Sequence, residues 1–144
     1  MVTVKDIVDA VILKLSQTFP SATIYEEEIK QGLAEPCFFV KLFPVAQDKE
    51  FGRRYKRYHT FDVHYFPLSK DDANVEMHDV AERLYDVLEW ISMGSGLHHG
   101  SKMNHEIVDG VLHFFVSYDF HLMRPKADVP KMQTLTKEGF IKNG

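Results

Sequence analysis

The chain has 144 residues, of which 44% are hydrophobic, and it carries a formal net charge of −4. This length predicts one domain with a substantial core, and the acidic balance argues against a general affinity for polyanions such as nucleic acids. A single cysteine, Cys37, excludes an intrachain disulfide and is expected to be a small buried hydrophobic residue. The charged N-terminus and the absence of an apolar run of about 18 residues indicate a soluble protein made in the cytoplasm.

The first half of the chain predicts one helix and three strands. Apolar residues at three- and four-residue spacing predict a helix that begins at the capping pair Thr3 and Asp6 and ends before Pro20. A strand is expected over residues 22–29, a loop over residues 31–36, and a second strand over residues 37–45 that is interrupted or bulged at Pro44. Alternation predicts a third strand from about Tyr55 to Phe66.

The second half predicts a helix followed by a hairpin. The helix is expected over residues 69–96, with Asp72 or Asn74 as its cap and two glycines as its stop. Its apolar face would carry Met77, Ala81, Leu84, Leu88 and Ile91. The dipeptide Asp109-Gly110 between two alternating runs predicts a two-residue hairpin turn within residues 104–123. One face of the last strand is expected to pack on the helices, and it consists of Leu112, Phe114, Val116, Tyr118 and Phe120.

This order of elements predicts a two-layer α+β fold. The sheet is expected to be antiparallel or mixed, with about five strands and with both helices packed on one face. Residues 1–123 would form the single domain, and residues 124–144 a C-terminal tail that is extended or partly mobile.

The eight histidines do not predict a metal site. Asp62 and His64 lie two residues apart on one strand face and could pair, but no third ligand follows from the spacing. His113 and His121 share a face but lie about 26 Å apart along a strand. His78 and Glu82 have the spacing of a solvated helical contact. No metal and no cofactor is therefore predicted.

Catalytic motifs are not predicted either. The serines of residues 92–101 lack the strand–turn–helix setting of an activated nucleophile. The stretch "GSGLHHG", residues 94–100, follows a helix instead of opening one, so it offers no helix N-terminus to a phosphate and is expected to be a loop. The sequence thus assigns no catalytic residues and predicts a protein that is not an enzyme.

Charge is unevenly distributed along the chain. Residues 49–57 hold five positive side chains and one acid, a net of +4, whereas residues 71–89 hold seven acids and one base, a net of −6. We expect the basic segment to be a flexible loop or hairpin tip. Two solvated surfaces are one explanation, and a head-to-tail contact between subunits is another. The candidate contact residues are Arg53, Arg54, Lys56 and Arg57 on one side, and Asp79, Glu82, Asp86 and Glu89 on the other.

Four blocks in order carry a family resemblance: "EEIKQGLAEPCFFVKL", "RRYKRYHTFDVHYFP", "MHDVAERLYDVLEWI" and "MNHEIVDGVLHFFVSYDFH". Over about residues 3–122, with a further match in "VPKMQTL", the chain resembles the small tail-terminator (tail-completion) proteins of long-tailed bacteriophages and of related prophage elements in Gram-positive bacteria. The resemblance implies either the terminator itself or a neighbouring neck component.

The resemblance also implies partners and a location. A terminator of this kind is a structural protein that closes the head-proximal end of the tail tube as a ring, commonly a hexamer. It contacts the tail tube protein and the head–tail connector protein, first in the host cytoplasm and then in the virion tail. DNA could pass through such a ring without specific binding. A second use of the acidic residues Asp79, Glu82, Asp86 and Glu89 is to line this channel, where like charge would repel the phosphates. The alternative from the residues themselves is a nucleic-acid-binding module that uses the basic segment with Tyr55 and Tyr58 as stacking residues.

Overall fold

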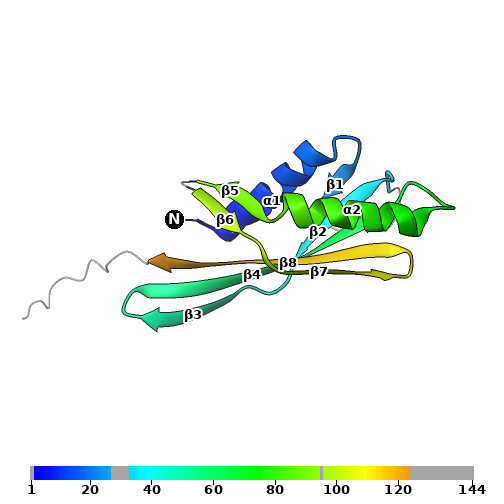
Figure 1. Ribbon diagram of the computed structural model, residues 1–144. Helices are drawn as coiled ribbons and strands as arrows, with labels where there is room; N and C mark the ends of the chain where they lie inside the picture. The colour runs from blue at the N-terminus through cyan, green and yellow to red at the C-terminus, as the bar shows by residue number, and fades with distance from the viewer. Residues whose placement is uncertain (1, 27–32, 95, 124–144) are drawn as a thin grey trace, which may run out of the picture.

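The computed structural model describes residues 2–26, 33–94 and 96–123, which form two helices and two sheets (Figure 1). The helices are α1 (Val4–Thr18) and α2 (Ala73–Val87), and both lie on the same face of the larger sheet (Figure 1). The strands are β1 (Thr23–Tyr25), β2 (Cys37–Leu42), β3 (Ala46–Phe51), β4 (Arg54–Phe66), β5 (Trp90–Met93), β6 (Gly96–His99), β7 (Ser101–Val108) and β8 (Val111–Met123). The predicted α+β class with both helices on one face is confirmed. The predicted tail, residues 124–144, lies outside the described residues.

The larger sheet has six strands in the order β1-β2-β4-β8-β7, and β3 also pairs with β4. β1 runs parallel to β2 and all other pairs are antiparallel, so the sheet is mixed. β4 is long enough to pair with β8 on one edge and with two strands on the other: β3 beside its first half and β2 beside its second half. The two long strands β4 and β8 therefore form the centre of the fold.

Local signals position α1 and the β7–β8 hairpin as predicted. Thr3 and Asp6 form a reciprocal capping box at the start of α1, which buries Ile7, Val11 and Leu15. Asp109 and Gly110 both have positive φ angles, +50° and +75°, as a two-residue turn of this type requires. Of the predicted core face of β8, Phe120 is half-buried and the other four residues are buried.

The structure corrects the end of the second helix. α2 ends at Val87, and Leu88 donates its backbone N–H to Leu84 as the C-cap. The following residues form the strand β5, which pairs with β6 in a separate two-stranded sheet. Ile91 is buried as predicted, but it reaches the core from β5. The stretch 94–100, predicted to be a loop, contains β6.

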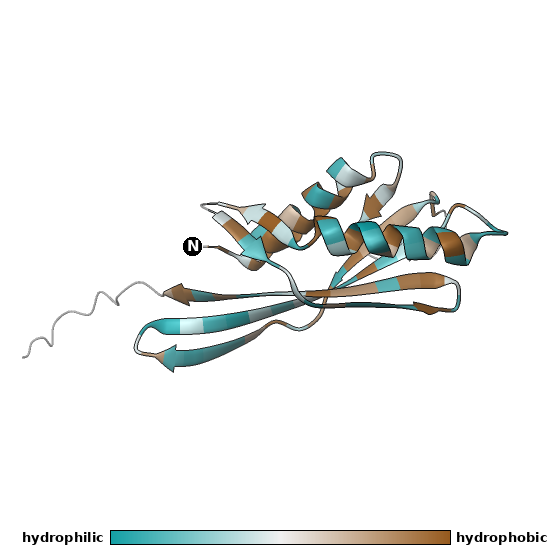
Figure 2. Ribbon diagram, viewed as in Figure 1, coloured by the Kyte–Doolittle hydropathy of each residue, from teal (hydrophilic) through white to brown (hydrophobic). Residues whose placement is uncertain are grey.

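The strand β3 was not predicted, and it changes the description of the basic segment. All six of its residues are exposed, so no alternation marks it in the sequence. It pairs with β4 through a tight turn at residues 52–53, where Gly52 has a φ of +56°. Residues 49–57 are therefore the end of a paired hairpin, which confirms the hairpin tip of the two expected alternatives and not the loop. Figure 2 shows this hairpin as largely hydrophilic, in contrast to β8.

Candidate functional site

The basic residues lie on the hairpin formed by β3 and the first half of β4, residues 46–58, called the basic hairpin below. The Arg54 guanidinium lies 3.3 Å from the Glu50 carboxylate, and Arg57 donates two hydrogen bonds to the Gln47 side chain, at 3.0 and 2.6 Å. The Lys56 ammonium lies 5.2 Å from the centre of the Tyr58 ring. These contacts hold the side chains of Arg54, Lys56 and Arg57 against the two strands of the hairpin.

The basic hairpin presents its charges on both faces. Lys56 and Arg57 are neighbours on β4, so their side chains point in opposite directions. Arg57 is paired with Phe120 on the helix side of the sheet, and Lys56 is paired with His121 on the face opposite the helices, called the outer face below. Tyr55 and Tyr58 also lie on opposite faces by this alternation. The two tyrosines therefore do not form one stacking platform, which the nucleic-acid alternative requires.

Three of the four predicted acidic residues lie together on α2. Asp79, Glu82 and Asp86 are exposed on the side of the helix opposite Met77, Ala81 and Leu84. Glu89 follows the end of α2, and its carboxylate lies 3.4 Å from His99 of β6. The acidic surface is therefore defined by the three helical residues, called the acidic face below. The tip of the basic hairpin lies at one end of the molecule, and α2 lies over the other half of the sheet (Figure 1).

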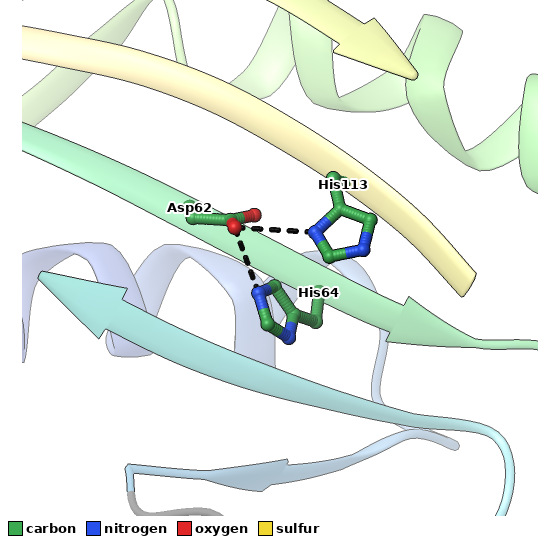
Figure 3. Close-up of side chains that lie close together, drawn as sticks. All are labelled: Asp62, His64 and His113. Carbon is green, nitrogen blue, oxygen red and sulfur yellow. Dashed lines mark hydrogen bonds and ion pairs between the residues drawn. The ribbon is translucent and has the colours of Figure 1, made fainter. Parts of the chain in front are cut away.

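A cluster that the sequence did not predict lies on the outer face. Asp62 and His64 of β4 meet His113 of β8, because His64 and His113 are directly opposite each other in the β4–β8 ladder (Figure 3). Asp62 Oδ2 lies 2.8 Å from His64 Nε2 and 3.1 Å from His113 Nδ1. The spacing along β4 predicts the Asp62–His64 pair but not its third member, His113, which is distant in the chain and depends on the strand register.

The Asp62 carboxylate is buried and charged. Burial raises the pKa of Asp62, but the hydrogen bonds from His64 and His113 outweigh it, and the pKa lies below its ordinary value. The side chain is 9% exposed, and Oδ1 is buried without a hydrogen-bond partner among the described residues. The cluster is therefore a buried anion that two imidazoles contact on one oxygen.

Cys37 and His78, predicted from the sequence to be a small buried residue and half of a solvated helical pair, have structural roles. Cys37 is buried, and burial raises the pKa of its thiol, which disfavours the reactive thiolate. His78 of α2 lies against His105 of β7, with ring nitrogens 3.3 Å apart, and the Tyr85 hydroxyl lies 2.8 Å from the other nitrogen of His105. These contacts attach α2 to the sheet.

Within the part of the chain that the structure describes, no helix is both long and apolar enough to cross a membrane.

The fold and its charged surfaces define a small α+β protein with two exposed surfaces of opposite charge. Residues 6–130 match the model of a family described as phage tail terminator protein. The match covers most of the chain, and the protein therefore belongs to the phage tail terminator family. No curated protein matches the chain. The family is a structural family, and membership in it makes the protein a component of the phage tail that interacts with other tail or head components.

Proposed function

We propose that the protein is the tail terminator that caps the head-proximal end of the tail tube and joins it to the head–tail connector. The family match over residues 6–130 carries this proposal. The protein acts as a homo-oligomeric ring, a hexamer, which is assembled on the tube in the host cytoplasm. It has no catalytic step, and its partners are its own copies, the tail tube protein and the connector protein.

The arrangement of charge supports a head-to-tail ring. The basic hairpin extends past the helices at one end of the molecule (Figure 1), and the acidic face lies on α2. A subunit with complementary surfaces at two different places forms a heterologous contact, and such contacts close into a ring when the rotation permits. Opposite charges on the two surfaces favour this pairing and disfavour contacts between like surfaces. We infer that the basic hairpin of one copy contacts the acidic face of the next.

Charge reversal tests the contact. Arg54→Glu with Arg57→Glu should lower the yield of joined heads and tails at least about tenfold, because the repulsion recurs at every interface of the ring. Adding Glu82→Lys and Asp86→Lys to the same chain should restore part of the yield. The matched control is Lys5→Glu with Lys70→Glu, since these side chains are 82% and 79% exposed and lie outside the hairpin. Circular dichroism of each variant establishes that it is folded.

The outcomes separate two uses of the acidic face. If Asp79, Glu82 and Asp86 line the channel for DNA, Glu82→Lys with Asp86→Lys will not rescue the hairpin variant, and the protein that carries these two lysines will retain DNA in a filter-binding titration. Assembly that is unchanged after reversal of Arg53, Arg54, Lys56 and Arg57 together would contradict the docking role of the basic hairpin.

A further inference from the structure

Three potential metal ligands converge on the outer face of the sheet. The ligand atoms of Asp62, His64 and His113 all lie within 4.8 Å of one another, and two of the separations are 2.8 and 3.1 Å. In a tetrahedral zinc site with bonds of about 2.0–2.1 Å, neighbouring ligand atoms lie about 3.3 Å apart. Two of the three separations are thus within about half an ångström of this value, and the third, between the two imidazole nitrogens, lies within 4.8 Å and would adjust when an ion binds.

The backbone holds the three side chains in place. His64 and His113 are a directly opposed pair on the two central strands, and Asp62 is two residues from His64 on the same face. β4 and β8 are each paired on both edges here, with β2 on one side and β7 on the other. Side chains on such a ladder lose little further freedom when they bind an ion, which favours binding.

The free oxygen of Asp62 is a second and independent observation. Oδ1 is buried without a hydrogen-bond partner among the described residues, although buried carboxylate oxygens are normally paired. Lys41 lies opposite Asp62 on β2, but its ammonium is placed over the Phe43 ring, 5.9 Å from the ring centre. A cation bound to the carboxylate would compensate the buried charge, and bidentate binding through both oxygens would also pair Oδ1.

The donor set indicates the kind of ion. Two imidazoles and one carboxylate suit Zn²⁺ and its first-row neighbours, whereas Mg²⁺ and Ca²⁺ prefer sites made only of oxygen. A hollow of about 530 Å³ on the same face is lined by His64, Phe39, Lys41 and Phe66, among others, so one of the three ligands borders open space. We propose that Asp62, His64 and His113 form a site for a divalent transition metal, best suited to Zn²⁺, with water as the fourth ligand.

Zinc alone is the probe for the test. The full chain, without an affinity tag and after treatment with a chelator, is titrated with ZnCl₂ in a calorimeter. We expect one equivalent to bind with a Kd of about 1 μM or tighter, and the melting temperature to rise with zinc concentration. Co²⁺ should replace zinc and give the visible absorption of a four- or five-coordinate site.

Variants assign the binding to the cluster. His113→Ala should weaken zinc binding at least tenfold, and Asp62→Asn should do the same without removing the side chain. His113→Gln keeps a polar side chain of similar reach and serves if His113→Ala does not fold. The matched control is His121→Ala, because His121 is an exposed histidine on the same strand and the same face. Binding that is absent, or that falls equally in the His121 variant, would overturn the proposal.

Discussion

Glu76 attaches the start of α2 to the end of β4. Its carboxylate accepts hydrogen bonds from the Tyr65 hydroxyl at 2.6 Å, and from the backbone N–H groups of Leu68 and Ser69 at 2.8 Å each. Burial raises the pKa of Glu76, but these hydrogen bonds outweigh it and the pKa lies below its ordinary value. The same side chain lies in the first turn of α2, where a negative charge is favourable.

This carboxylate gives the first prediction, which concerns pH. Because its pKa is lower in the folded state, ionised Glu76 contributes stability that is complete above its unfolded pKa, near 4.5, and is lost as the pH falls through the folded pKa. Glu76→Gln should lower the free energy of unfolding by about 1.5–3 kcal/mol at pH 7. Urea titrations at pH 7 and below pH 4 measure the difference, which should shrink at the lower pH. A difference that is equal at both pH values would contradict this role.

Among the elements, the end of α2 and the start of β7 meet at Gly100. Its backbone N–H donates to the Glu89 carbonyl at 2.6 Å, and the carbonyl of Leu88 accepts a hydrogen bond from the buried Tyr118 hydroxyl of β8. A Cβ atom at Gly100 would lie 2.6 Å from the Leu88 carbonyl oxygen and 2.9 Å from a Val116 methyl group. The junction of helix, β5–β6 hairpin and sheet therefore leaves no room for a side chain.

Gly100→Ala should therefore destabilise the fold. The nearest obstacle is a backbone atom that cannot rotate away, so we expect a loss of about 1–3 kcal/mol in the free energy of unfolding. Gly96→Ala is the control, since a Cβ there meets nothing within 4 Å, and it should change stability by less than about 0.5 kcal/mol. Denaturant titration of the two variants measures both effects. A small effect at Gly100 would mean that α2 and β7 can separate at little cost.

The elements that the sequence predicts correctly are those with local signals. A capping pair marks α1, a two-residue turn marks the β7–β8 hairpin, and alternation gives the core face of β8. β3 could not be found in this way because it is exposed along its whole length and is held by pairing with β4. The end of α2 was misplaced because Leu88 and Ile91 continue the helical spacing, although Ile91 is buried from a strand.

The candidate sites also differ in whether a local sequence signal marks them. The basic and acidic surfaces follow from charge runs within single segments of the chain. Seven of the eight predicted contact residues therefore lie on β4, on α2 or in the turn between β3 and β4. Only Glu89 falls outside its expected element, because α2 ends before it. The cluster of Asp62, His64 and His113 needs the register between β4 and β8, which joins residues 51 positions apart. No local pattern specifies that register, and the third ligand could not be predicted.

At the scale of the whole molecule, the ring depends on which surfaces of neighbouring copies meet. Phe51 is 83% exposed at the tip of the basic hairpin, and Val75 is 61% exposed on α2, one turn before Asp79. Both are uncharged, so cysteines at these two positions leave the charges of both surfaces unchanged. Cys37 is buried and its thiol is disfavoured from reacting. Cysteines at these positions can therefore report the contact without changing its charges.

We expect assembled tails that carry Phe51→Cys and Val75→Cys in one chain to give a ladder of covalent oligomers with a short bis-maleimide, because each hairpin reaches the α2 of the next copy. The largest band counts the subunits in the ring. Chains that carry only one of the two cysteines should give no ladder, since a head-to-tail contact joins two different surfaces. The matched control joins Phe51→Cys with Leu13→Cys, which is 56% exposed on α1. A ladder from the Leu13 pair and none from the Val75 pair would place the hairpin against α1 of the neighbour, and would reject the acidic face as its partner.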